Sequence, residues 1–119
     1  MSSLNIRISQ MEGKVPVTVI HVSGEVDANS HQELDAKAAE ITGGGAKHII
    51  LDLSDTSYMS SAGFRSMHKI HTALQGSGDD AAALKLLNPS DEVRRLLKTM
   101  GFDAHITVYD DLNEAVGAF

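Results

Sequence analysis

Two segments rich in hydroxyl and carboxylate side chains could carry chemistry. They are residues 23–29 and residues 54–63, and the second holds four serines and one threonine within ten residues. Each follows a run of β-branched and aliphatic residues of the kind found in buried strands. In an open parallel sheet, functional groups gather at the carboxyl ends of the strands. We therefore expect both segments to lie along one edge of a sheet.

Ser60 and Ser61 stand at the expected start of a helix. Ser60 is placed to be the N-cap, because its hydroxyl can accept a hydrogen bond from a main-chain N–H two or three residues on. Ser61 then falls at the first helical position, and its hydroxyl should face solvent. Gly63 is expected to leave space for another molecule to approach. A phosphate would suit Ser61, since the helix dipole favours added negative charge by about 0.3–1 kcal/mol. From spacing alone, ordinary capping is the commoner role of such serines.

Hydropathy periodicity predicts the elements that position these residues. Leu4, Ile6 and Ile8 alternate with polar residues as in a half-exposed strand, and a short turn leads to a second strand over residues 17–22. Further strands are expected over residues 48–53, 82–87 and 105–108. Four helices are expected after the N-cap residues Ser30, Ser60, Ser90 and Asp111.

Two of these helices carry detailed expectations. Ser30 and Glu33 have the spacing of a capping box. Val93, Leu96, Leu97 and Met100 form the stripe that the third helix should bury. The element order predicts an α/β fold with a mostly parallel central sheet of about five strands, an antiparallel N-terminal strand and about four helices.

Composition excludes several classes of function. The length of 119 residues fits one domain, and a net charge of −6 opposes binding to nucleic acids or anionic membranes. The absence of cysteine excludes disulfides, thiol catalysis and thiolate metal sites. No apolar run is long enough to span a membrane, and the N-terminus lacks the features of a signal peptide, so a cytoplasmic location is expected.

No catalytic or metal site emerges from the remaining residues. His68 and His71 lie three residues apart on the expected second helix, but no third ligand is placed by the sequence, and Lys69 between them disfavours a cation. Ser61 lacks the Gly-x-Ser-x-Gly elbow of a serine hydrolase. We therefore expect neither an enzyme nor a cofactor. Thr56, Ser57 and Ser60 remain lesser candidates for modification.

Three blocks of residues stand out when they are taken together. They are Gly24-Glu25-Val26-Asp27, Ile50-Leu51-Asp52-Leu53-Ser54 and Tyr58-Met59-Ser60-Ser61-Ala62-Gly63-Phe64. In this order they resemble the STAS domain, the module of sulphate transporters and anti-sigma-factor antagonists. The resemblance covers essentially the whole chain, residues 1–119, as a single STAS domain. Because no transporter segment is attached, the stand-alone antagonist is the closer match.

The resemblance implies a protein-binding switch controlled by phosphorylation. In such proteins the unphosphorylated antagonist binds an anti-sigma factor that is also a serine kinase, which frees the sigma factor. The kinase then phosphorylates the antagonist, the pair separates, and a phosphatase resets the cycle. The family's acceptor serine falls on Ser61. Many members have Asp directly before the acceptor, whereas this chain has Ser60, which keeps the capping role but loses the charge.

The partner surface implied by the resemblance lies around Ser61. For Asp27 two interpretations are open: it contacts the kinase or orients the Ser61 loop, or it stabilises its own turn. Two other functions remain open, namely a STAS domain that senses a small ligand or nucleotide, and an unphosphorylated scaffold in a signalling assembly. A monomer or weak dimer is expected. The expected partner-binding residues are Asp27, Asn29, Ser60, Ser61, Ala62 and Gly63.

Overall fold

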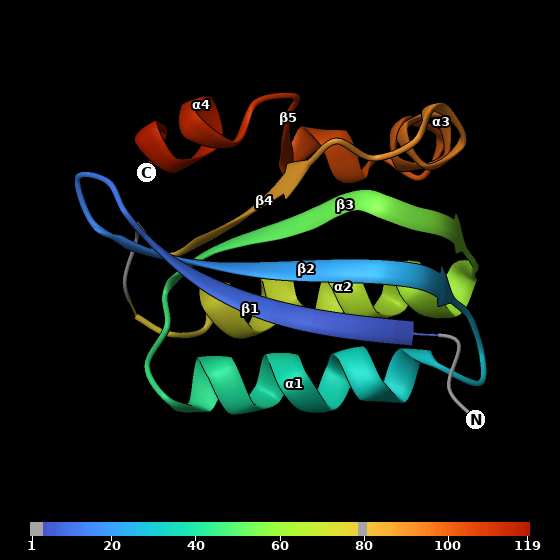
Figure 1. The fold of residues 1–119 in the computed structure, drawn as a ribbon, viewed down its shortest axis with the longest axis horizontal. Helices are drawn as coiled ribbons and strands as arrows, with labels where there is room; N and C mark the ends of the chain where they lie inside the picture. Colours follow the sequence, from blue (N-terminus) through green and yellow to red (C-terminus); the bar gives the residue numbers. More distant parts are fainter. Residues whose placement is uncertain (1–3, 79–80) are drawn as a thin grey trace.

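A five-stranded mixed sheet forms the centre of the chain, as the sequence predicts (Figure 1). The computed structural model describes residues 4–78 and 81–119. The strands follow one another in the order β1-β2-β3-β4-β5; β1 is antiparallel to β2, and the other neighbours are parallel. Their bounds are β1 Leu4–Glu12, β2 Pro16–Val26, β3 His48–Met59, β4 Ala83–Leu87 and β5 Thr107–Tyr109.

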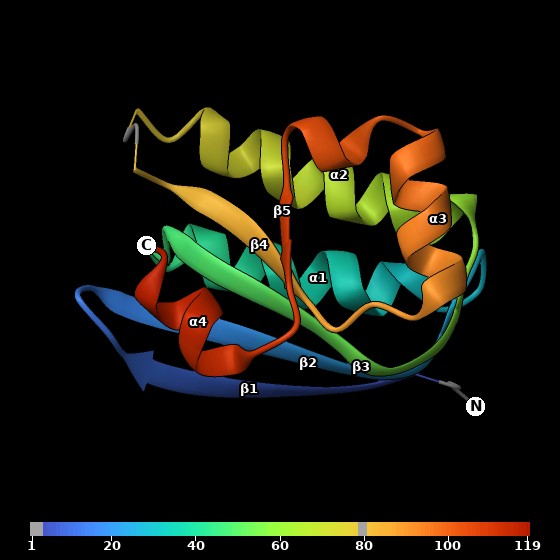
Figure 2. The ribbon, with the colours of Figure 1, turned by 90° about the horizontal axis from the view of Figure 1, so that it is seen from above.

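Four α-helices pack around the sheet. Helices α1 (His31–Gly43) and α2 (Ser61–Gln75) lie side by side on one face, and Figure 2 shows them beneath the strands. Helices α3 (Asp91–Thr99) and α4 (Leu112–Gly117) follow β4 and β5, and a short 3-10 helix, η1 (Phe102–Ala104), joins α3 to β5. No helix within residues 4–78 or 81–119 combines the length and apolar character needed to cross a membrane.

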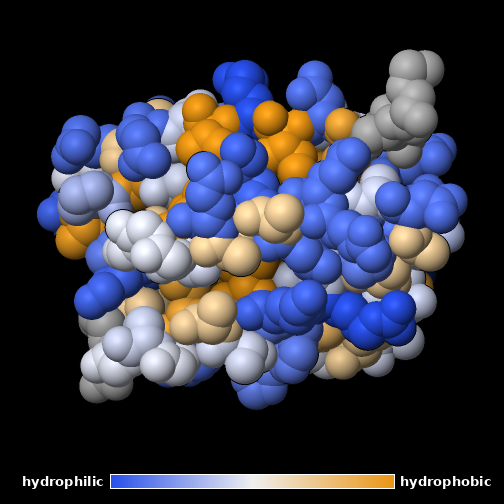
Figure 3. All heavy atoms as spheres, turned by 90° about the horizontal axis from the view of Figure 1, so that it is seen from below, coloured by the Kyte–Doolittle hydropathy of each residue, from blue (hydrophilic) through white to orange (hydrophobic). Residues whose placement is uncertain are grey.

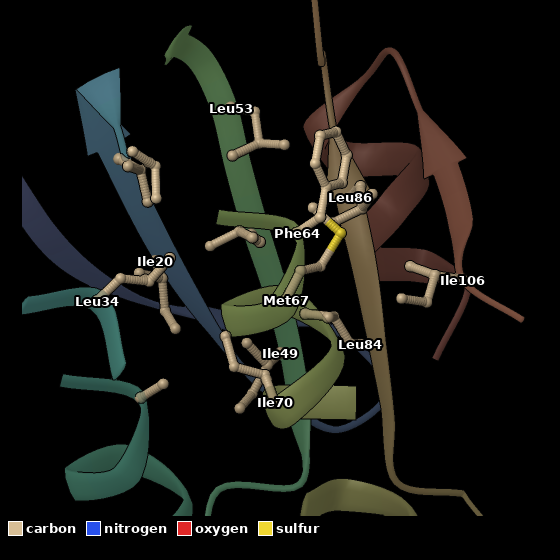
Figure 4. Packing of buried hydrophobic residues seen from close by; sticks show 14 of the residues in the cluster. Ile20, Leu34, Ile49, Leu53, Phe64, Met67, Ile70, Leu84, Leu86 and Ile106 are labelled. Carbon is tan, nitrogen blue, oxygen red and sulfur yellow. The ribbon is translucent and has the colours of Figure 1, made fainter. Parts of the chain in front are cut away.

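The main core lies between the sheet and the pair α1 and α2. Phe64, Met67, Ile70 and Leu74 recur at helical spacing along α2, and all four are buried against apolar side chains of β2, β3 and β4 (Figure 4). Burying each such side chain contributes about 1.5–3 kcal/mol. The outer surface on this side is mainly hydrophilic, with smaller apolar areas between (Figure 3). This packing fixes where α2 begins.

The opposite face of the sheet is only partly covered. Helix α4 closes a smaller cluster that contains Val19, Ile50 and Val116. Polar side chains occupy part of the same face. His21 Nδ1 lies 2.7 Å from Asp52 Oδ2, and His21 Nε2 lies 2.9 Å from Ser9 Oγ. These bonds link β1, β2 and β3 on a face that α4 does not seal.

The strand β3 is longer than the sequence indicates. Residues 54–59, expected to be loop, continue β3 beside the end of β2. The pairing is interrupted at two places, between His21 and Ser23 and between Gly24 and Glu25. Thr56 is buried, and its hydroxyl donates to the carbonyl of Val22 at 2.9 Å. A polar sequence therefore forms a strand here because its neighbour supplies the hydrogen bonds.

The third helix also departs from expectation. Val93 and Leu97 are buried, but Leu96 and Met100 are 36% and 49% exposed, so the expected buried stripe is only half correct. The stripe is narrower than expected, because Leu96 and Met100 lie at its solvent-exposed border. Helix α3 lies at the same end of the molecule as the carboxyl ends of β2 and β3 (Figures 1 and 2).

Candidate functional site

The ends of β2 and β3 bring the two polar segments together. The strands are parallel, and their last residues, Val26 and Met59, are paired. The main-chain N–H of Ser60 then donates to the carbonyl of Val26 at 2.8 Å. Asp27 and Ser60 therefore leave the sheet from adjacent positions, so the segments after both strands meet at one edge, as expected.

Asp27 builds the turn that leads into α1. Its Oδ1 accepts hydrogen bonds from the main-chain N–H groups of Asn29 at 2.9 Å and Ser30 at 3.0 Å. The N–H of Asn29 contributes most to lowering the pKa of Asp27 below its ordinary value; the Ser30 hydroxyl, the Ser30 N–H and the charge of His31 act in the same direction. These bonds are those of a turn-forming aspartate, one of the two roles considered for Asp27.

The predicted capping box at the start of α1 is not formed through Ser30. Its hydroxyl accepts a hydrogen bond from the main-chain N–H of Asp27 at 3.0 Å and donates to the carbonyl of Glu25 at 2.7 Å. No side-chain cap bond from Ser30 is present at this helix. Ser30 and Glu33 have the spacing of a capping box, but the Ser30 hydroxyl is bonded to main-chain groups of Asp27 and Glu25 instead of to the helix.

The division of labour between Ser60 and Ser61 is the one expected. Ser60 has extended backbone angles, and its Oγ accepts from the N–H of Ala62 at 3.2 Å, which confirms it as the N-cap. Ser61 is the first residue of α2 and is exposed. Its hydroxyl makes no hydrogen bond with any residue in the described parts of the chain. It is free to react or to meet a partner.

Gly63 has a different role from the one expected. It is buried, and a Cβ placed on it would lie 2.5 Å from Met59 Cγ and 3.0 Å from Val26 Cγ1. The side chains of Met59 and Val26 occupy the space that a side chain at residue 63 would need. The expectation that Gly63 leaves room for another molecule is therefore wrong. Ala62, also expected in the partner surface, is 4% exposed. Ala62 and Gly63 therefore lie beneath the surface and support it, but they are not accessible to a partner.

The other hydroxyl candidates differ in access. Thr56 is 4% exposed and its hydroxyl is already bonded, so it cannot accept a phosphate in this fold. Ser57 is exposed on β3. Ser66, one turn and a half along α2 from Ser61, is fully buried. Ser61 is therefore the exposed serine of α2 that no structural bond engages.

The surface around Ser61 combines acidic and apolar groups. Glu25 is exposed next to the end of β2, and Asn29 is exposed in the turn after Asp27. Tyr58 is 45% exposed next to the end of β3, and sequence reasoning did not single it out. Its position one residue before buried Met59, in an alternating strand, is the signal that would have placed it outside. These groups suit contact with another protein better than catalysis.

A hollow of about 240 Å³ lies near this edge, between the first halves of α1 and α2, and its lining includes His31, Arg65 and Ser66. No three side chains within residues 4–78 and 81–119 are placed, as they stand, to hold a metal ion. A cavity of about 590 Å³ is lined by residues that include Pro16, Thr18, Ile41 and His48. Pro16 and His48 begin β2 and β3, so this cavity lies at the opposite ends of the strands from Ser61.

Comparison with known proteins identifies the family of this chain and solved structures that share its fold. The family model that matches is the STAS domain, over residues 9–115. An anti-sigma factor antagonist from Mycobacterium paratuberculosis is similar in structure, with a TM-score of 0.84, 20% identity and coverage of 98% of this chain and 93% of that one. The Bacillus cell fate determinant SpoIIAA in its phosphorylated form gives a TM-score of 0.73 and 22% identity, covering 96% of this chain and 98% of that one. The anti-sigma factor antagonist SpoIIAA in its unphosphorylated form gives 0.71 and 22%, covering 92% of each chain.

Proposed function

The chain belongs to the STAS domain family, and from this premise we propose that it is an anti-sigma-factor antagonist switched by phosphorylation of Ser61. In the unphosphorylated state it binds an anti-sigma factor that is also a serine kinase; in the phosphorylated state it releases that partner. The observation that carries the proposal is the exposed Ser61 hydroxyl, which no described residue engages, directly after a neighbouring serine that caps the helix.

Phosphoryl transfer requires from this chain only an accessible hydroxyl at Ser61. The kinase transfers the γ-phosphoryl group of ATP to Ser61 Oγ: the new O–P bond replaces the O–H bond, the proton passes to the kinase or solvent, and ADP leaves. A phosphatase hydrolyses the O–P bond to restore the alcohol. Because Ser60 provides the cap, modification of Ser61 breaks no hydrogen bond of the helix. The added charge of about −1.5 to −2 lies where the helix dipole favours it.

Release follows from charge and bulk in the contact surface. Glu25 and Asp27 carry negative charge at this edge, and Arg65, one turn after Ser61 on α2, is an exposed cation beside it. A phosphate on Ser61 adds bulk at the point where the two surfaces must close. A loss of about 3 kcal/mol there weakens binding by roughly a hundredfold or more, which is enough to exchange partners.

Asp27 supports the site in two ways that are compatible. Its Oδ1 is held by the turn, while its Oδ2 accepts no hydrogen bond from any residue the structure describes. The same carboxylate can therefore fix the turn and offer an oxygen to the partner. Ser60, in the position where many family members have Asp, contributes no charge. The kinase that acts on this chain should therefore rely less on a cation opposite residue 60.

Phosphate transfer is the direct test. The chain is incubated with ATP and the candidate serine kinase, and the product is measured by intact mass and peptide mapping. We expect one added phosphate, on Ser61, in the wild type and in the control Ser57→Ala, and none in Ser61→Ala. A phosphate that maps elsewhere, or that persists in Ser61→Ala, contradicts the proposal.

Binding of the same kinase tests the switch itself. Ser61→Ala should bind as tightly as the unmodified wild type, and Ser61→Asp should fold normally but bind at least tenfold more weakly. Tight binding by Ser61→Asp would show that charge at this position does not separate the pair. Absence of phosphate on the wild type, together with stable oligomers that form without a kinase, would favour a scaffold. A thermal shift with nucleotide alone would favour a ligand sensor.

A further inference from the structure

One exposed face of α2 carries both Ser61 and a cation. Ser61 and Arg65 are exposed, whereas residues 62–64 between them are buried. Arg65 follows Ser61 by four positions in the same helix, so the two side chains are neighbours, with Cβ atoms about 5–6 Å apart. We propose, on the basis of the proposed function, that Arg65 binds the phosphate once Ser61 is phosphorylated, and that this pairing reverses the charge which the face presents to a partner.

The guanidinium of Arg65 is not bound to any carboxylate in the described part of the chain. Helix α2 contains no aspartate or glutamate, and no described residue forms an ion pair or hydrogen bond with the Arg65 side chain. The lysines of α1 and α2 are engaged in ion pairs. Lys37 Nζ lies 3.3 Å from Glu40 Oε2, and Lys69 Nζ lies 3.4 Å from Asp35 Oδ2. Arg65 is therefore available to an anion that arrives next to it.

The direction of side chains in a helix brings this guanidinium toward Ser61. Each Cα–Cβ bond leans toward the N-terminus of the helix, so a long side chain covers the turn before its own Cα. The turn that Arg65 covers in this way begins at Ser61. Arg65 also lines the hollow of about 240 Å³ between α1 and α2, so its side chain has room to change rotamer. An anion four residues before a cation is the more favourable order on a helix.

The chemistry of a guanidinium suits a phosphate monoester. Its planar fork can donate two parallel hydrogen bonds to phosphate oxygens, and it keeps its positive charge at every physiological pH. The cap of the helix does not compete for these donors, because Ser60 Oγ already accepts from the N–H of Ala62 at 3.2 Å. The phosphate and Arg65 can therefore pair without any change in the hydrogen bonds that begin α2.

The pairing changes the charge that a partner meets on this face. Before modification, the face presents the positive charge of Arg65 beside a neutral hydroxyl. Phosphorylation adds about −1.5 to −2 charges, so Ser61 and Arg65 together then carry roughly −0.5 to −1. Glu25 and Asp27 at the adjacent strand end are negative as well. A partner carboxylate that contacts Arg65 in the unmodified state is therefore displaced and repelled after modification.

A phosphate installed without a kinase tests the pairing. Phosphoserine is incorporated at residue 61 during translation of the full-length chain, and the second pKa of the phosphate is measured by ³¹P NMR titration. This pKa is ordinarily about 6, and a bound guanidinium lowers it because it stabilises the dianion. We expect the phosphate pKa to be higher by about 0.2–0.4 in Arg65→Gln than in the chain that keeps Arg65. Arg65→Lys should give an intermediate value, since it keeps the charge but loses the fork.

The matched control removes a distant positive charge. Lys14 is exposed in the turn between β1 and β2, at the opposite ends of the strands from Ser61, so Lys14→Gln should leave the phosphate pKa unchanged. Equal phosphate pKa values in Arg65→Gln and Lys14→Gln would refute the pairing. The Arg65 Nε–H resonance, which needs no variant, should also shift between the unmodified and phosphorylated chains, and an unchanged resonance would refute the pairing too. A shift specific to Arg65 supports it even where no kinase modifies Ser61, so the pairing and the proposed function fail separately.

Discussion

Replacing Gly63 by alanine tests how α2 approaches the strand ends. The new Cβ would lie 2.5 Å from Met59 Cγ and 3.0 Å from Val26 Cγ1, in a region where both of these side chains are buried. Val26 is β-branched and stiff, so it cannot turn aside. Overpacking of this kind costs about 1–3 kcal/mol, and the closeness of the Met59 contact favours the upper half of that range. In a helix, alanine is otherwise better than glycine by about 1 kcal/mol.

A second glycine provides the matched control. Gly43 is the last residue of α1, and a Cβ placed there would meet no atom within 4 Å. In urea unfolding followed by circular dichroism, Gly43→Ala should be as stable as the wild type or up to about 1 kcal/mol more stable. Gly63→Ala should fall about 1–3 kcal/mol below Gly43→Ala. Equal stability of the two variants would refute the packing role assigned to Gly63.

Two further predictions concern bonds in β3. Partial burial acts to raise the pKa of Asp52, but hydrogen bonds outweigh it and hold the pKa below 3.8. The stability this carboxylate contributes is therefore full only well above pH 3.8, its ordinary pKa, and is lost as the pH falls through that value and then through the lower pKa of the folded state. Asp52→Asn should flatten this acid limb in thermal unfolding at a series of pH values, and a limb as steep as in the control Asp55→Asn would contradict the assignment. Thr56→Val leaves a carbonyl of β2 without its donor and should cost about 1–3 kcal/mol in urea unfolding; no loss would show that the bond contributes nothing.

The order of the elements was predictable because their signals are local. Alternation marks β1, and helical spacing marks the buried stripe of α2 from Phe64 to Leu74. The extension of β3 was not predictable in this way. Residues 54–59 are mostly polar, and their strand conformation depends on β2, which lies next to them only after folding. The hydroxyl of Thr56 donates to the carbonyl of Val22, 34 residues earlier in the chain. A local sequence pattern cannot predict a contact between residues so far apart.

In the candidate site too, features that depend on neighbouring residues were predictable, and features that depend on distant residues were not. The roles of Ser60 and Ser61 follow from the geometry of one helix turn, and the structure agrees with it. The role of Gly63 depends on Val26, which precedes it by more than thirty residues, so sequence reasoning assigned it to the wrong surface. Ser30 failed as a side-chain cap for a related reason. Its hydroxyl had competing partners in the preceding turn, and the bond to Glu25 was formed instead.

The packing of Gly63 also bears on how the proposed switch works. The main-chain bond from Ser60 to Val26 and the contacts that enclose Gly63 hold the start of α2 against β2 before any partner arrives. Ser61 therefore lies on a preformed surface, and its hydroxyl has no internal bond whose loss could rearrange the turn. A phosphate added there changes the charge of the surface and leaves the backbone in place. A switch of this kind acts on the partner through electrostatics and fit, so phosphorylated and unmodified chains should unfold with closely similar stability while differing in partner affinity.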